Sequence, residues 1–345
     1  MRVLCLIVAL LVALPACRGI IPRTGKVLDH LVPDSGESRR LYTLYAGNGQ
    51  RYFDGGKFAQ AEDQFLKALE QDTYSHKANL GAAWSALHQG TPQKLQTAIE
   101  RFDRTIDLNG SDSRAWLGLG MAHAELGLRQ LREAEAADEK HPQAKEPERS
   151  RLTAEAKRLR GESARNFEEA KDALERTLKL HRDDPRALLA LGNVAANQND
   201  FAAAERHYRK YVDLARQTRE IFQKRKSTAE TEEERKALVD KINRNVKDEG
   251  RARDMLAAIY FKQERHQDAL AELNAILDID AQPPDNVYLL RAQCLALAGQ
   301  YGEAVQDVDR FLKYTSRKFD PMVEQAYKLK DEYSRKLASA AGARK

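Results

Sequence analysis

The sequence has 345 residues, of which 42% are hydrophobic, 7% aromatic and 32% charged. Its 57 basic and 52 acidic residues leave a formal net charge of +5, with both signs mixed along the chain, and this distribution argues against nucleic-acid binding. Good helix formers dominate, and no alternating run rich in Val, Ile and Thr follows the N-terminus, so the sequence predicts an all-α protein.

The first residues have the character of an export signal. One Arg precedes an apolar run from Val3 to Leu14, which is shorter than the about 20 residues that a membrane-spanning helix needs. A run of this length fits the core of a secretory leader. The leader then ends in Leu14-Pro15-Ala16-Cys17.

This ending resembles the cleavage box of bacterial lipoproteins, although Pro15 stands where that family usually has a small residue other than proline. The resemblance implies that residues 1–16 are a lipoprotein signal peptide and that Cys17 is acylated as the new N-terminus. An ordinary secretory leader cut near Ala16 and an uncleaved anchor are the alternatives. The expected location is the cell envelope, and Arg18, in place of a retaining Asp, favours the periplasmic face of the outer membrane.

The cysteine content agrees with this interpretation. Cys5 lies in the leader, so only Cys294 remains in the body after processing, and no intrachain disulfide is possible. Residues 17–41 are rich in Pro, Gly, Ser and charge, and we predict a flexible tether between the anchor and the body.

From residue 42 onward, small and large residues recur in a fixed order. The first occurrence places Gly49, Tyr52, Ala61, Phe65 and Ala68 on two helices separated by a Gly break. The same step of 12 between small residues joins Gly49 to Ala61, Gly192 to Ala204, Ala257 to Ala269 and Ala292 to Ala304. Small positions let helices approach closely, and the large side chains fill the space between them.

This pattern resembles the tetratricopeptide repeat, a helix-turn-helix unit of 34 residues. The resemblance implies a right-handed α-solenoid over residues 42–318, followed by a capping helix and tail at 319–345. A generic helical bundle with chance periodicity is the alternative. The six expected units lie near residues 42–75, 74–112, 113–184, 185–218, 250–284 and 285–318.

Two insertions interrupt the repeats, at 128–163 inside the third unit and at 215–249 after the fourth. Apolar residues step by three and four along both, as from Leu128 to Leu131 and from Thr218 to Phe222. We therefore predict that each insertion extends two neighbouring helices into a protruding antiparallel hairpin of coiled-coil character. Because both segments are highly charged, a disordered loop is the alternative.

The resemblance also implies where a partner binds, because the first helix of each unit lines the concave face in this family. The positions expected to face this groove are Arg114, Leu117, Met121, Arg186, Leu189, Asn193, Asn197, Arg251, Phe261, Lys262, Asn286, Leu289 and Gln293. Arg recurs at the same place in three successive units, which suits an extended peptide with acidic groups. Alternatively, these Arg side chains only solvate the starts of their helices.

No motif in the sequence predicts catalysis. The Gly-rich stretch at 47–58 lacks the first Gly and the final hydroxyl of a phosphate-binding loop, and no metal-ligand spacing of Cys or His occurs. We therefore expect no enzyme, no cofactor, no metal site and no small-molecule substrate. The sequence favours a lipid-anchored interaction scaffold that binds a protein or peptide in its groove and assists assembly of an envelope complex. An envelope enzyme or a cell-wall-binding protein with its site in the insertions is the alternative.

Overall fold

The computed structural model describes residues 36–315 and 321–342, so the predicted leader and Cys17 lie outside it. The described residues form thirteen α-helices and one short 3₁₀ segment, with no strand among them. The helices are α2 (Gly36–Asp54), α3 (Phe58–Gln71), α4 (His76–Gln89), α5 (Pro92–Leu108), α6 (Ser113–Lys140), α7 (Glu148–Leu180), α8 (Pro185–Asn197), α9 (Phe201–Ser227), α10 (Glu232–Lys262), α11 (His266–Ile279), α12 (Asp285–Leu297), α13 (Tyr301–Tyr314) and α14 (Pro321–Gly342), and η1 is His141–Gln143. The predicted all-α class is confirmed.

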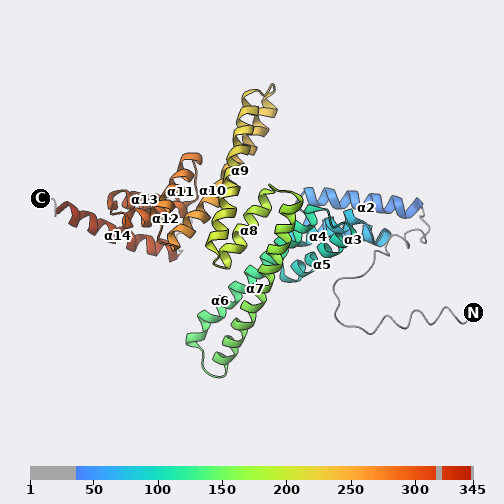
Figure 1. The fold of residues 1–345 in the computed structure, drawn as a ribbon, viewed down its shortest axis with the longest axis horizontal. Helices are drawn as coiled ribbons and strands as arrows, with labels where there is room; N and C mark the ends of the chain where they lie inside the picture. The colour runs from blue at the N-terminus through green and yellow to red at the C-terminus, as the bar shows by residue number, and fades with distance from the viewer. Residues whose placement is uncertain (1–35, 316–320, 343–345) are drawn as a thin grey trace, which may run out of the picture.

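Consecutive helices pack in antiparallel pairs that follow one another along the molecule (Figure 1). The pairs are α2 with α3, α4 with α5, α6 with α7, α8 with α9, α10 with α11, and α12 with α13. Helix α14 packs on α13, and its buried Ala326 lies 34 residues after the buried Ala292 of α12. Helix α14 thus occupies the place of a seventh first helix.

The first helix begins earlier than expected. Helix α2 starts at Gly36, whereas the sequence predicts a flexible tether over residues 17–41, so residues 36–41 are helical instead. Its first turn carries Glu37, which is favourable at a helix N-terminus, and the Tyr42 hydroxyl is hydrogen-bonded at 2.8 Å to Ser75, the N-cap of α4. The described part of the chain contains no helix with the length and apolar character that crossing a bilayer requires.

The recurring small residues are needed because large rings occupy the space beside them. A Cβ atom added to Gly192 would lie 2.5 Å from the ring of Tyr208, which is fully buried in the next helix. At Gly118 the same atom would lie 2.1 Å from the ring of Phe102. Neither distance is sterically possible, so the order of small and large residues fixes how closely neighbouring helices approach, both within a pair and between pairs.

Four of the turns between the two helices of a unit share one backbone conformation. Gly56, Asn199, Glu264 and Gly299 have φ between 60° and 76°, and each lies two residues after the end of its first helix. In each turn the following residue donates its N–H back five positions, as in Asp200 N to Ala195 O at 2.9 Å. These turns belong to the four units in which the small residues of the two helices are 12 residues apart. The same spacing therefore corresponds to the same turn.

Two helical hairpins project from the solenoid in opposite directions in the view of Figure 1. The first hairpin consists of the distal parts of α6 and α7, with η1 and residues 144–147 at its tip. The second hairpin consists of the distal parts of α9 and α10, with Thr231 as the N-cap of α10. Both segments assigned to insertions are therefore helical in the structure.

The second hairpin is joined to the solenoid by a buried ionic cluster. The carboxylate of Glu249 on α10 has no exposed surface and pairs with Arg219 of α9 and with Arg253, whose Nη2 lies 2.9 Å away. Arg253 also pairs with Glu272 of α11 at 2.6 Å. Three helices thus meet at this ionic cluster, which consists of Arg219, Glu249, Arg253 and Glu272.

Candidate functional site

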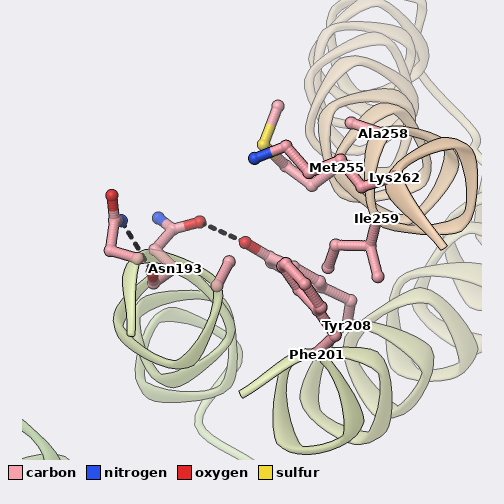
Figure 2. Close-up of a pocket in the computed structure, with 9 residues that line it drawn as sticks. Asn193, Phe201, Tyr208, Met255, Ala258, Ile259 and Lys262 are labelled. Atoms are coloured by element: carbon pink, nitrogen blue, oxygen red, sulfur yellow. Dashed lines mark hydrogen bonds between the residues drawn. The ribbon is translucent and has the colours of Figure 1, made fainter. Parts of the chain in front are cut away.

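A pocket of about 200 Å³ opens between α8 and α10, the first helices of two consecutive units (Figure 2). Helix α9 contributes the ring of Phe201 and the buried ring of Tyr208. The full lining is Asn193, Ala196, Asn197, Phe201, Tyr208, Met255, Ala258, Ile259 and Lys262. Most of these side chains are apolar, and Lys262 is the single charged residue in this lining.

The buried Tyr208 fixes the orientation of one polar group at this pocket. Its hydroxyl donates to Asn193 Oδ1 at 2.7 Å, as Figure 2 shows. Because the oxygen is held by Tyr208, the Nδ2 group of Asn193 points away from that ring. Burial raises the pKa of Tyr208, so its hydroxyl keeps its proton and remains a donor.

Asn197 lies one helical turn further along α8. Its Nδ2 donates to the backbone oxygen of Asn193 at 2.8 Å, which leaves Oδ1 as its outward acceptor. From α10, the ammonium of Lys262 lies 6.0 Å from the ring centre of Phe201, and the side chain of Met255 is 41% exposed beside it. Amide groups on α8 and a cation on α10 therefore face one apolar pocket.

The structure brings three of the predicted groove residues together, namely Asn193, Asn197 and Lys262. The sequence did not single out Ala196, Phe201, Met255, Ala258 or Ile259 as binding residues, and it assigned Tyr208 to the repeat core. Ala258 lies four residues, or one turn, before the predicted groove residue Lys262 on α10, so the helical step could have identified it. Phe201 opens the second helix of its unit, where no groove position was expected.

The three recurring arginines are paired locally. Arg114 contacts Asp112 through Nε at 3.0 Å and through Nη2 at 2.7 Å, and Asp112 is the N-cap of the same helix. Burial acts to raise the pKa of Asp112, but the bonds from Arg114 outweigh it and lower that pKa. Arg186 contacts its own N-cap residue Asp184 at 3.5 Å.

Arg251 likewise contacts Asp248 on the preceding turn of α10, at 3.2 Å. All three guanidinium groups therefore lie beside a carboxylate of their own segment. This arrangement supports the alternative in which these arginines solvate the helix starts. It does not favour a continuous basic ladder along the groove.

The remaining predicted groove residues differ in how much of each side chain is exposed to solvent. Leu117 and Leu289 are 1% and 4% exposed, so both belong to the core. Met121, Leu189, Phe261 and Gln293 are partly exposed along their helices. Asn286 donates to Asp254 Oδ2 of the preceding unit at 3.0 Å, and burial raises the pKa of Asp254.

Other reactive or metal-ligating side chains of the described residues are not grouped into a site. Cys294 is fully buried in the core, and burial raises its pKa to about 11, which leaves the thiol protonated and unreactive. Within residues 36–315 and 321–342, no group of three or more His, Cys, Asp or Glu side chains could hold a metal ion.

Comparison with known families identifies the repeats. The tetratricopeptide repeat family matches residues 47–94, 93–145 and 149–217. The matched residues lie in helices α2 to α9, and the helix pairs beyond residue 217 continue the same helix-turn-helix architecture. No curated protein sequence matches the chain.

Three solved structures with similar folds are distant from this chain in sequence. The chain is similar to the APC/C hetero-tetramer Cut9–Hcn1 (19% identity, TM-score 0.50), covering 90% of this chain and 44% of that one. It is also similar to PilF of Pseudomonas aeruginosa (16% identity, TM-score 0.50), covering 84% of this chain and 99% of that one. A third similar structure is that of PilW, a type IV pilus biogenesis factor (14% identity, TM-score 0.52; coverage 85% and 99%). At these identities the similarity establishes the helical-repeat solenoid fold.

Proposed function

We propose that this protein is a lipid-anchored scaffold of the cell envelope that binds a partner protein or peptide in the groove formed by its first helices. Tetratricopeptide repeats are protein-interaction modules, which supports a binding role. In this proposal the partner enters the pocket between α8 and α10, and the scaffold assists assembly of an envelope complex. The anchor is the acyl group on Cys17, on the periplasmic face of the outer membrane.

The pocket is the observation that carries the binding proposal. It combines apolar walls with a few oriented polar groups, which is the usual character of a recognition site. Its residues come from two consecutive units, so an occupant would contact both units at once. The locally paired arginines are not needed for this mode of binding.

The envelope setting rests on the leader and its Leu14-Pro15-Ala16-Cys17 ending. PilW, which shares the fold, is a pilus biogenesis factor, and a similar assembly role here is part of the proposal. Two acyl chains or more would give stable membrane attachment, whereas one chain alone binds reversibly.

Capture from the native envelope tests the binding role. Full-length protein, solubilised with its anchor, is used as bait, and captured proteins are quantified by mass spectrometry. Ala258→Trp fills the pocket, and Ala136→Trp places the same ring on the exposed surface of the first hairpin as a matched control. We expect specific partners to be lost from the first variant and retained by the second. Equal capture by both variants would contradict binding at this pocket.

Metabolic labelling tests the anchor. Cys17→Ser should abolish incorporation of labelled palmitate and release the protein from the membrane fraction or leave it unprocessed. Cys294→Ser is the control, because that thiol lies in the buried core. Equal labelling of the Cys17 variant and the parent protein would show that the lipid is attached elsewhere or that it is absent.

A further inference from the structure

We infer that the second hairpin is a self-association surface, on which the same hairpin of a second copy of this chain docks to complete a four-helix bundle. The inference goes beyond the proposed function, because it concerns an arm that projects from the solenoid (Figure 1) and not the groove. It follows from an apolar stripe that the hairpin leaves uncovered, and from exposed charges on its two helices that match across two copies.

The apolar stripe runs along α9. Ile221 is 57% exposed, and the ring of Phe222 is only partly buried under the ammonium of Lys241, which lies 6.0 Å from the ring centre. Leu214 is seven residues before Ile221, so it shares that face of the helix, and it too is only partly buried. Among the described residues, Asn245 Oδ1 on α10 is buried without a hydrogen-bond donor. The hairpin is thus incomplete as a two-helix unit.

One pair of opposite charges stands at equal height on the two helices. The contact between Lys241 and Phe222 sets the height, because α9 and α10 run antiparallel. Lys224 is two residues nearer the tip than Phe222, and Asp240 is one residue nearer the tip than Lys241. At about 1.5 Å per residue, the two charges differ in height by about 2 Å. Both side chains are exposed, and neither forms an ion pair within the described part of the chain.

A second pair lies nearer the base of the hairpin. Glu220 is two residues before Phe222, and Arg244 is three residues after Lys241, so these charges again lie at nearly equal height. Both are exposed and without an ion pair among the described residues, and Arg244 Nε donates only to the backbone oxygen of Asp240, at 3.3 Å. The hairpin therefore carries two matched pairs of charges that it does not use internally.

Two copies related by a two-fold axis parallel to their hairpins bring these charges together. With both tips at the same end, α9 of one copy lies beside α10 of the other and runs antiparallel to it, as in a four-helix bundle. Lys224 of each copy then faces Asp240 of the other, and Glu220 faces Arg244. Ile221 lies between the two pairs of charges, where the second copy covers it.

The reverse arrangement is unfavourable. If the tips point in opposite directions, a two-fold axis places α9 beside α9. The basic end of that helix, Lys224, Arg225 and Lys226, then lies against Arg216 of the other copy. Like charges in an interface oppose association, so the charge pattern selects the arrangement with aligned tips.

The size of the arm sets the expected strength of the dimer. From Val212 to Ser227, α9 extends about 24 Å at about 1.5 Å per residue, and two helices side by side are about 20 Å wide. Such faces bury about 1,000 Å² in total, which is at the low end for specific interfaces and corresponds to a Kd on the order of 10 μM. Exposed ion pairs add little to stability, so the charges set the alignment and the apolar stripe supplies the affinity.

Sedimentation equilibrium of the full-length protein tests the inference, in a detergent whose density the solvent matches. We expect the parent to dimerise, and Ile221→Asp to raise the dimer Kd at least about tenfold because it places a charge in the apolar stripe. Leu44→Asp is the matched control, because Leu44 is 51% exposed on α2, outside the hairpin. It should leave the Kd unchanged.

A charge-swap series tests the alignment of the two copies. Lys224→Glu and Asp240→Lys each place like charges opposite one another, and each should raise the Kd about tenfold. The double variant restores opposite charges and should return the Kd to within about threefold of the parent value. Because the two residues form no ion pair within the described part of one chain, recovery reports a contact between copies.

Three results would overturn the inference: a parent protein that stays monomeric, an Ile221→Asp variant that dimerises as tightly as the parent, and a double variant that does not recover. If the parent is monomeric and Ile221→Asp loses native partners in the capture experiment, the stripe binds another protein instead. If the parent is monomeric and Ile221→Asp no longer cosediments with phosphatidylglycerol vesicles, it binds a lipid surface. None of these results bears on the pocket, which Ala258→Trp tests separately.

Discussion

The two protruding hairpins have similar length but are held together by different interactions. In the first hairpin, small and branched residues form a closed seam, with Ala134, Ala137, Leu152, Ala156 and Leu159 all less than 9% exposed. At its base, Ser163 Oγ donates to Gly127 O at 2.8 Å, which requires close approach of α6 and α7. The first hairpin is therefore stabilised mainly by tight apolar packing.

The second hairpin has a more open seam. Between residues 216 and 248, Ala229 and Leu238 are the buried residues, while Phe222 is partly exposed under Lys241 and Ile221 is 57% exposed. Its attachment depends on the ionic cluster around Glu249. The comparison shows that one repeat scaffold can support a projecting arm either through a continuous apolar seam or through a charged base.

The largest expected effect comes from breaking the charged base. Glu249→Ala leaves Arg219 and Arg253 without their shared partner, although their side chains are only 13% and 14% exposed. Removing one partner of a buried pair typically costs about 3–5 kcal/mol. Urea unfolding followed by circular dichroism should show a loss of this size.

The control for that measurement is Glu220→Ala on the exposed face of α9, which should change the free energy of unfolding by less than about 0.5 kcal/mol. If the Glu249 variant were as stable as this control, the ionic cluster would not be what attaches the second hairpin.

The next prediction compares the free-energy cost of removing one side chain from the seam of each hairpin. Leu159→Ala removes a side chain that is 5% exposed, and it should cost about 2–3 kcal/mol. Phe222→Ala removes a larger side chain from the open seam, and the cost should be nearer about 1 kcal/mol because this side chain is only partly buried. Hydrogen exchange of the two hairpins measures both. A larger cost for the Phe222 variant would reverse the proposed difference between the seams.

A smaller effect is expected from removing the end of the first hairpin altogether. The five seam residues form a hydrophobic cluster of their own, separate from the clusters of the solenoid. Deleting residues 132–159 and joining the arms with a short turn should therefore leave a cooperative, helical protein with a nearly unchanged Tm. Disappearance of the thermal transition would mean that the solenoid depends on this hairpin.

A modest effect is expected in the partly exposed ionic network of Glu205, Arg209 and Arg265, which lies near the start of α9. Burial acts to raise the pKa of Glu205, but hydrogen bonds from Arg265 and Arg209 outweigh it and lower that pKa below 4.5. A carboxylate with a lowered pKa stabilises the fold above pH 4.5, and this contribution is lost as the pH falls through the lowered value. Glu205→Gln should cost about 0.5–1 kcal/mol at pH 7.

That cost should shrink as the pH falls below about 4.5. Urea titrations at several pH values would measure it, with exposed Glu220→Gln as the reference. A difference that is constant with pH would assign the loss to packing rather than to charge.

The helical class and the repeat units could be predicted well from the sequence because both depend on local periodicity. Small residues 12 apart, such as Gly192 and Ala204, are visible without any structure. The apolar steps of three and four likewise indicated helices at both hairpins. The start of α2 was misplaced because residues 36–41 are mostly polar and lack an apolar stripe.

The pocket and the charged base were harder to predict because both depend on how separate helices are placed. Glu249 falls outside an apolar stripe, so its burial between two arginines is invisible to hydropathy. Phe201 and Met255 converge only because α8 and α10 leave a space between them. The sequence placed the recurring arginines in the groove, but positional recurrence does not reveal the aspartates that Arg114 and Arg186 contact.

The four shared turns have a consequence for protein engineering. Because the turns at Gly56, Asn199, Glu264 and Gly299 have the same backbone, segments could be recombined between units at these points without altering the path of the chain. At Glu264 a side chain occupies a conformation that glycine adopts freely, so Glu264→Gly should remove a local strain of about 1 kcal/mol. The turns are thus natural crossover points at which chimeric solenoids of altered groove chemistry could be assembled.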